Sequence, residues 1–212
     1  MQTNPATSEN RIALRKLMIS LALRNQKPGS GSSIEFLRKR TTMIAFPNLN
    51  NILFPLKWAV VGAGATRLYM PERMTDDLDI LILTEDDQEV QERLKKAGYT
   101  YHGQLAIGGS QWISPENFPL DVLSSDEKWV ASALESAQTN RDGQNLPILP
   151  LPYLVLMKFC ASRPQDIGDI GRMLGQATPE QLSETRQLFQ KYLPDDSEDL
   201  ESLVYLGQLE LK

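Results

Sequence analysis

Residues 74–83 read MTDDLDILIL, and this stretch places acids at the start of an apolar run. Asp77 and Asp79 are separated by one residue, and the leucines and isoleucines that follow are typical of a buried β-strand. Side chains alternate between the two faces of a strand, so residues two apart project to the same side and can bind one divalent cation together. Asp76 falls on the opposite face and is left out of the pair.

A third acid follows further along the chain. Asp121 lies in the short apolar segment FPLDVL, residues 118–123. Three acids on neighbouring strands would form a metal site, because carboxylates held close together repel one another and need a cation. Two other interpretations stay open: the first acids lie in a solvated loop before the strand, or Asp121 is the solvent-facing member of an alternating strand. A structural calcium loop fits less well, since the EF-hand spacing and its final glutamate are absent.

A glycine turn precedes the acids, in the segment WAVVGAGAT at residues 58–66. Gly62 and Gly64 allow the backbone to turn tightly between a strand and a helix, and backbone N–H groups at such a turn can hold phosphate. Neither a GxGxxG nor a GxxxxGK[ST] pattern is present, so a purely steric role for the glycines stays open.

Strands and helices are expected to alternate through the middle of the chain. The pattern predicts strands at 58–61, 78–83 and 120–123, with helices after the glycine turn and at 86–97. This alternation predicts an α/β or α+β core with a mixed β-sheet and flanking helices. We expect an N-terminal helix and linker at 1–33, the core at 34–149 and a C-terminal helical region at 150–212. Within the first part, residues 10–24 have the apolar spacing of an amphipathic helix.

The composition limits the chemistry available. The chain has 212 residues, one cysteine, one histidine and a net charge of −5. Cys160 alone cannot form an intramolecular disulfide or a multi-cysteine zinc site, and it fits a reducing cytoplasm, where we expect it to be buried. A single histidine leaves little room for a histidine-rich metal centre, so carboxylates must perform any catalysis. The basic stretch LRKR at 37–40 is the best candidate for contact with a polynucleotide. No apolar run is long enough to span a membrane.

The order of these motifs resembles the DNA polymerase β-type nucleotidyltransferase superfamily. Within it, the chain is most similar to the AbiEii-like and MenT-like proteins of bacterial abortive-infection and toxin–antitoxin systems. The signature R-x-T-x-D-[IL]-D of that branch is matched by Arg73, Thr75, Asp77, Leu78 and Asp79. The GAGA at 62–65 stands where the branch has G-G-x-A, with Ala63 in place of the second glycine and no serine after it.

A second segment, residues 151–174, resembles the helix that follows the catalytic domain in the same branch. It contains Lys158, Arg163, Asp166 and Asp169, and the last three are spaced so that they can share one helix stripe with an i,i+3 ion pair. One interpretation is a salt-bridged surface. The other, implied by the resemblance, places Lys158 and Arg163 over a triphosphate, where they would neutralise charge as it develops.

The resemblance implies transfer of a nucleotidyl group from an NTP, such as ATP, to an acceptor hydroxyl, assisted by two Mg²⁺ ions. The metal ligands would be Asp77, Asp79 and Asp121, which with Lys158 are the expected catalytic residues. The expected nucleotide-binding residues are Gly62, Ala63, Gly64, Arg73, Thr75 and Arg163. The acceptor could be tRNA, a protein or a small molecule, and a cognate antitoxin protein is a further expected partner. The alternative is a catalytically idle nucleotidyltransferase-like module that serves as an antitoxin or scaffold.

Overall fold

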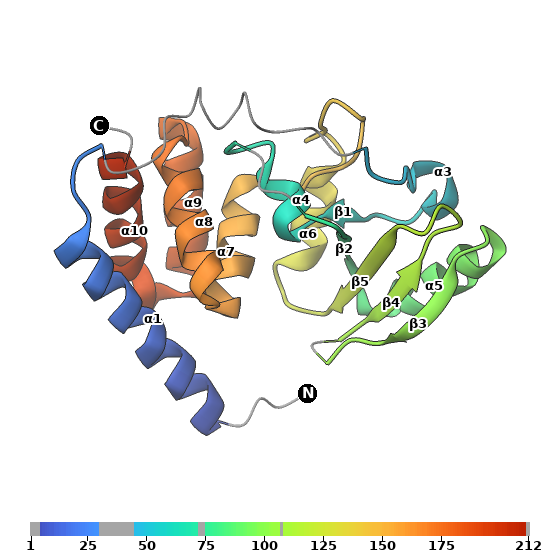
Figure 1. Cartoon of the computed structure of the whole chain (residues 1–212), viewed down its shortest axis with the longest axis horizontal. Coiled ribbons are helices and arrows are strands. Elements are labelled where there is room, and N and C mark those ends of the chain that lie inside the picture. Colours follow the sequence, from blue (N-terminus) through green and yellow to red (C-terminus); the bar gives the residue numbers. More distant parts are fainter. Residues whose placement is uncertain (1–4, 30–44, 72–74, 107, 211–212) are drawn as a thin grey trace. The chain divides into compact units, whose positions relative to one another are not determined.

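The computed structural model describes residues 5–29, 45–71, 75–106 and 108–210 (Figure 1). They divide into two compact units, a sheet unit formed by Arg40–Pro150 and a helical unit that combines Met1–Lys39 with Leu151–Lys212. The N-terminal and C-terminal segments therefore belong to one unit, although they are far apart in sequence. The three-part division at 33 and 149 stays a prediction.

A five-stranded mixed β-sheet forms the centre of the sheet unit. Its strands, in the order β1-β2-β5-β4-β3, are β1 (Ala59–Val60), β2 (Leu78–Leu83), β5 (Pro119–Ser125), β4 (Ser110–Ile113) and β3 (Thr100–Gln104). β2 and β5 are parallel, whereas the other neighbouring pairs are antiparallel. Short helices α3 (Asn50–Leu53) and α4 (Gly62–Thr66), the 3₁₀ turn η1 (Thr84–Asp86), and helices α5 (Asp87–Lys96) and α6 (Val130–Ala137) complete the unit.

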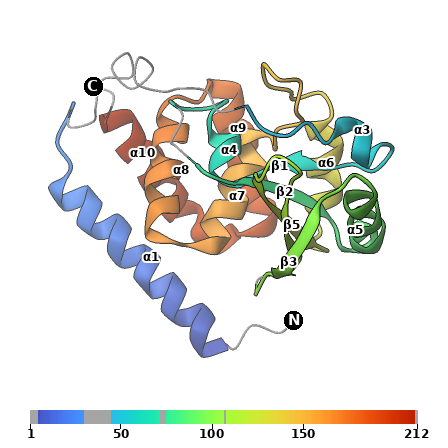
Figure 2. The ribbon, with the colours of Figure 1, turned by 45° about the vertical axis from the view of Figure 1, so that its right-hand side comes forward.

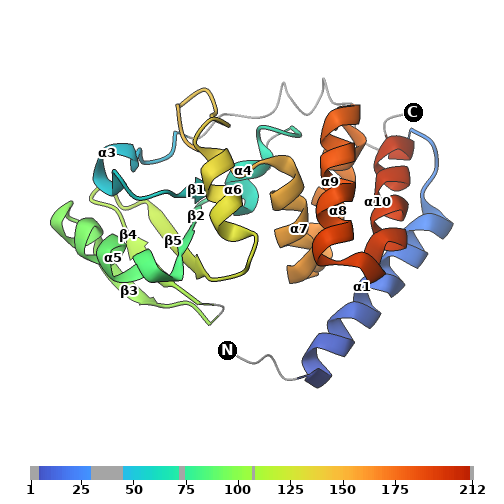
Figure 3. The ribbon, with the colours of Figure 1, turned by 180° about the vertical axis from the view of Figure 1, so that it is seen from behind.

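Alternating burial along the strands explains how this sheet packs. Leu78, Ile80 and Ile82 on β2 are fully buried, as are Leu120 and Val122 on β5. Helices α5 and α6 lie against the face of the sheet seen from behind in Figure 3, and their apolar stripes are buried. Because neighbouring strands share this buried face, the opposite face is left for the polar residues of the same strands.

The predicted mixed α/β core is confirmed, and the strand at 78–83 has the expected bounds. The strand expected at 58–61 is shorter, since pairing with β2 is limited to Ala59 and Val60. The basic stretch at 37–40 lies outside the described residues. Helix α4 ends at Thr66, because the chain enters turns immediately after it.

The helical unit contains α1 (Pro5–Asn25), α7 (Leu151–Ala161), α8 (Pro164–Gly175), α9 (Pro179–Tyr192), the 3₁₀ turn η2 (Pro194–Asp196) and α10 (Ser197–Glu210). Figure 2 shows α8 beside α10, and glycines allow this close approach. A Cβ atom on Gly207 would lie 1.9 Å from the carbonyl oxygen of Gly171, so no larger residue fits there without movement. The rings of Phe159 and Phe189 join α7 to α9 in an edge-to-face contact, with centroids 4.9 Å apart.

Helix α1 confirms the predicted N-terminal helix but buries little of its apolar surface. Leu14, Leu17 and Leu21 are exposed, whereas Arg15 is 4% exposed. The Arg15 guanidinium forms ion pairs with Asp196 and Asp199, and these contacts fix α1 to the start of α10. In the described part of the chain, no helix combines the length and the apolar character needed to cross a membrane.

The prediction that Cys160 is buried is wrong, because its side chain is exposed at the end of α7. The apolar residues before it pack inward, and Cys160 falls on the other side of the helix.

Candidate metal and nucleotide site

Three carboxylates meet at one end of the parallel strand pair in the sheet unit. Asp79 on β2 is directly opposite Asp121 on β5 in the strand register. Asp77 comes one residue before β2, in a bend, and its carboxylate turns back toward the other two. One oxygen from each residue lies within 4.8 Å of the others, and all three side chains are half-buried. The sequence spacing therefore predicted the residues that the fold brings together.

This geometry suits a divalent cation. Oxygens that lie within 4.8 Å of one another are close enough for the three side chains to share one divalent cation after small side-chain adjustments. Half-buried carboxylates so close together repel one another, and a bound cation would remove that repulsion. Asp76 is exposed and is not part of the cluster, in agreement with the prediction that it lies on the opposite face from Asp77 and Asp79.

Neutral groups orient two of the three acids. The hydroxyl of Thr75 donates a hydrogen bond to Oδ1 of Asp77, and the amide of Gln111 donates one to Oδ1 of Asp121 over 3.0 Å. Thr75 was expected to bind nucleotide, and its described contact is with the neighbouring acid. Sequence reasoning missed Gln111, because a glutamine within a strand carries no motif of its own.

The glycine turn lies directly against Asp79. Gly62 has a φ of +61°, and a Cβ atom there would lie 1.8 Å from Oδ2 of Asp79, so both the backbone conformation and the close contact favour glycine. Gly64 has a different role, because a Cβ atom there would lie 3.1 Å from the ring of Phe46 and 3.3 Å from the side chain of Val60. Of the two glycines that the sequence grouped together, Gly62 borders the acids and Gly64 packs in the core.

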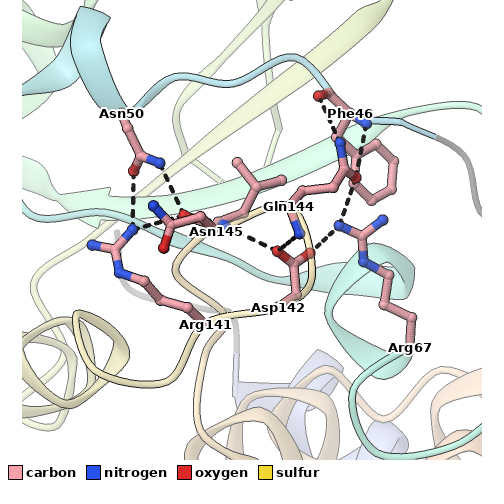
Figure 4. A network of polar contacts seen from close by, with 8 residues as sticks. Phe46, Asn50, Arg67, Arg141, Asp142, Gln144 and Asn145 are labelled. Atoms are coloured by element: carbon pink, nitrogen blue, oxygen red, sulfur yellow. Dashed lines mark hydrogen bonds and ion pairs between the residues drawn. The ribbon is translucent and has the colours of Figure 1, made fainter.

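A polar network fixes helix α4, which carries this turn (Figure 4). The guanidinium of Arg67, at the end of α4, forms a buried ion pair with Asp142 and donates to Oε1 of Gln144 over 3.0 Å. The Gln144 side chain also accepts a hydrogen bond from the backbone N–H of Phe46 and donates one to its carbonyl oxygen. The Arg67 guanidinium lies over the Phe46 ring, 4.4 Å from the ring centroid. These contacts hold α4, and with it Gly62, in place beside Asp79.

The loop that supplies Asp142 is itself well supported. Oδ1 of Asp142 accepts hydrogen bonds from the backbone N–H groups of Gln144 and Leu146, both over 2.9 Å. Arg141 and Asn50 both donate to the carbonyl oxygen of Asn145, as Figure 4 shows. No sequence motif marked this network, because its members are spread over almost a hundred residues.

Lys158 and its acidic neighbours form a separate cluster within the helical unit. The Lys158 ammonium on α7 donates to Asp166 over 3.2 Å and to Asp169 over 3.0 Å, both on α8. These three side chains are at most 4% exposed, so the interpretation as a salt-bridged surface is wrong for them, whereas Arg163 is exposed. The predicted i,i+3 ion pair is confirmed, since Arg163 binds both carboxylate oxygens of Asp166 over 2.6 and 3.1 Å.

Residues 151–174 are two helices rather than the one that the resemblance implied. Ser162 has a φ of +52°, and Pro164 begins α8, so the helical hydrogen-bond ladder ends at this point. The break lets α8 fold back so that its acids reach Lys158. The predicted contact of Lys158 and Arg163 with a triphosphate stays a prediction, and Arg73, expected to bind nucleotide, lies outside the described residues.

No protein-family model matches the sequence, and no curated protein matches it either. Among solved structures, the antibiotic-resistance factor ANT(2'')-Ia is similar at 16% identity and a TM-score of 0.40, over 72% of this chain and 82% of that chain. The Megavirus polyadenylate synthase is similar at 10% identity and a TM-score of 0.37, over 93% of this chain and 45% of the synthase. The Cid1 poly(U) polymerase is similar at 15% identity and a TM-score of 0.29, over 76% of this chain and 52% of that chain. These similarities are weak, so the function proposed below rests on the geometry of the three acids.

Proposed function

We propose that the chain is a nucleotidyltransferase that depends on a divalent cation and uses an NTP as donor. The observation that carries the proposal is the group of three carboxylates, Asp77, Asp79 and Asp121, with an oxygen from each within 4.8 Å of the others. The R-x-T-x-D-L-D motif around the first two acids supports a nucleotidyl transfer rather than another metal-assisted reaction.

The reaction forms one bond and breaks another at the α-phosphorus of the NTP. The acceptor hydroxyl oxygen bonds to phosphorus, the bond to the β-phosphate bridging oxygen breaks, and pyrophosphate leaves. Bound Mg²⁺, most simply as two ions, would neutralise the phosphate charge and lower the pKa of the acceptor hydroxyl. Asp77 and Asp79 would hold the cations on the donor side, and Asp121 would hold the second cation beside the acceptor hydroxyl, whose proton leaves as the bond to phosphorus forms.

The remaining predicted residues would bind the donor. Backbone N–H groups at 62–65 would face the β- and γ-phosphates, and a cationic side chain, Lys158 or Arg163, would stabilise the pyrophosphate as it leaves. Arg73 and Thr75 complete the expected nucleotide-binding set. Thr75 would act through Asp77, whose carboxylate it holds.

The finer assignment is a toxin of the AbiEii-like and MenT-like branch, acting in the cytoplasm and controlled by an antitoxin protein. Its acceptor would be a tRNA 3′ end, another protein or a small molecule. The motif matches at Arg73 to Asp79 and at Lys158 to Asp169 support that branch.

The test is incubation with each α-labelled NTP, magnesium and either total RNA or cell lysate. The proposal predicts one labelled class of acceptor, with labelling lost in Asp77→Ala and Asp79→Ala. Labelling that is unchanged in these variants would contradict it. If nothing is labelled and NTPs with magnesium do not raise the melting temperature, the idle antitoxin or scaffold module is favoured instead.

A further inference from the structure

A polar row crosses the sheet beyond the three acids. In the strand register Asp79 on β2 is opposite Asp121 on β5, which is in turn opposite Gln111 on β4. His102 lies on β3, at an irregularity in its pairing with β4, and its Nδ1 atom is 3.1 Å from Oε1 of Gln111. Two further polar side chains therefore continue the row of acids over two more strands.

The direction of the hydrogen bonds in this row is fixed by chemistry. A carboxylate only accepts hydrogen bonds, so Gln111 must present its NH₂ group to Oδ1 of Asp121, 3.0 Å away. Its Oε1 atom then faces His102 and needs a donor, so Nδ1 of His102 must carry a proton. The imidazole thus selects the orientation of the amide, and the amide selects the orientation of the carboxylate.

Orientation matters for Asp121, because the terminal torsion of an aspartate side chain is broad and roughly two-fold. With Oδ1 held by Gln111, the other oxygen, Oδ2, accepts no hydrogen bond from the residues that the structure describes. That oxygen is the one left for a proton or a cation. Gln111 therefore sets which carboxylate oxygen of Asp121 is available to the reaction.

The two sides of the acid cluster are chemically different. On the Asp79 side, the backbone at Gly62 approaches so closely that no Cβ atom fits. On the Asp121 side, Gln111 is half-buried and His102 is exposed, so two side chains that can both donate and accept hydrogen bonds face solvent. If the phosphates of the donor lie along the glycine turn, the acceptor must approach from the opposite side.

We infer that Gln111 is a positioning residue for Asp121, and that Gln111 and His102 form the acceptor side of the site, which takes a molecule carrying a hydroxyl group beside further polar groups, such as a ribose or another sugar. This inference rests on the proposed function and names the side of the site from which the acceptor enters. Gln111 acts by holding the Asp121 carboxylate in one orientation, and His102 acts by holding Gln111 and by offering its exposed ring to the acceptor.

The experiment compares Gln111→Met with Gln104→Met. Methionine has nearly the length of glutamine but cannot donate to Asp121, and Gln104 is an exposed glutamine on the adjacent strand β3 with no side-chain contact to the acids. Initial rates of label transfer are measured against NTP concentration and then against acceptor concentration. The acceptor is the fraction of total RNA or cell lysate that the wild-type protein labels.

For Gln111→Met, kcat is expected to fall about 10- to 100-fold, since a hydrogen bond to a charged group is lost. The KM for NTP is expected to stay as in wild type, and the melting-temperature rise on addition of NTP and magnesium is expected to be retained. If Gln111 were merely structural, Gln111→Met would instead have a lower melting temperature and would bind less NTP. Gln104→Met should match wild type in every measurement.

The exposed His102 gives a second variant whose folding is not in question. His102→Ala is expected to raise the KM for the acceptor a few-fold while the KM for NTP stays unchanged. If wild type transfers label and both Gln111→Met and His102→Ala behave as wild type, the inference is overturned and the proposed function stands. If wild type transfers no label to any acceptor, the proposed function fails, and this inference fails with it.

Discussion

The acids of the sheet unit and the buried acids of the helical unit differ in how their charge is balanced. Asp166 and Asp169 both accept hydrogen bonds from the Lys158 ammonium, so that cluster carries its own cation. Asp77 and Asp121 instead accept hydrogen bonds from a hydroxyl and an amide, which orient a carboxylate without neutralising it. The first arrangement can hold a fold together unaided, whereas the second is suited to a cation that comes from solution.

The largest expected effect comes from removing one carboxylate of the sheet unit. Asp79→Asn keeps the shape of the side chain but weakens its hold on a cation, so label transfer from NTP should fall by roughly 10³-fold or more. The rate is measured with saturating magnesium and a variant shown to be folded by circular dichroism. Asp76→Asn, a change to the exposed acid beside the cluster, should keep the wild-type rate. An equal loss in both variants would contradict a specific role for the acid cluster in the transfer.

Removing the internal cation should act on stability instead. Lys158→Met leaves the buried Asp169 without its partner and Asp166 with Arg163 alone, which should lower the free energy of unfolding by about 3–5 kcal/mol. Urea unfolding followed by tryptophan fluorescence measures this loss. The variant also tests the predicted catalytic role of Lys158: transfer by the remaining folded molecules falls if Lys158 acts on the triphosphate and is retained if its part is structural.

A smaller effect is expected where the glycine turn meets the acids. Gly62→Ala places a side chain at a φ of +61° and against Asp79, so we expect a loss of about 1–3 kcal/mol in unfolding free energy. Transfer should fall as well, because Asp79 must move. Gly143→Ala is the matched control, since a Cβ atom there would meet no atom within 4 Å. Equal stability of the two variants would show that the contact at Gly62 is not needed.

The smallest effect belongs to an exposed ion pair in the helical unit. The hydrogen bond from Arg186 lowers the pKa of Glu201, so this pair contributes stability above the unfolded pKa and loses it as the pH falls through the folded pKa. Both side chains are about half exposed, at 47% and 50%, so Glu201→Gln should cost less than about 1 kcal/mol at pH 7. Thermal unfolding at pH 7 and at acidic pH should show the difference shrinking with acidity. A cost as large as that of Lys158→Met would remove the distinction between buried and exposed pairs.

The sequence predicted the sheet class and the acid cluster because both depend on local patterns. The apolar run at 78–83 identified β2, and two-residue spacing identified Asp77 and Asp79 as one group. The register of β5 against β2, which places Asp121 opposite Asp79, is a property of strand pairing that local spacing does not contain.

Other contacts depended on the path of the chain. The ion pair of Arg67 and Asp142 joins residues 75 positions apart, and the break at Ser162 reverses α8 so that Asp166 and Asp169 reach Lys158. Gln111 escaped notice because a glutamine in a strand carries no motif. Its role becomes visible only when the register places it beside Asp121.

The central claim is that the sheet unit binds its divalent cation through these three acids. It is tested most directly by titrating Mn²⁺, as a paramagnetic substitute for Mg²⁺, into the folded chain and measuring the free ion by electron paramagnetic resonance. We expect saturable binding in wild type and in Asp76→Asn, and a loss of that binding in Asp77→Asn, Asp79→Asn and Asp121→Asn. Undiminished Mn²⁺ binding in the three cluster variants would contradict the claim.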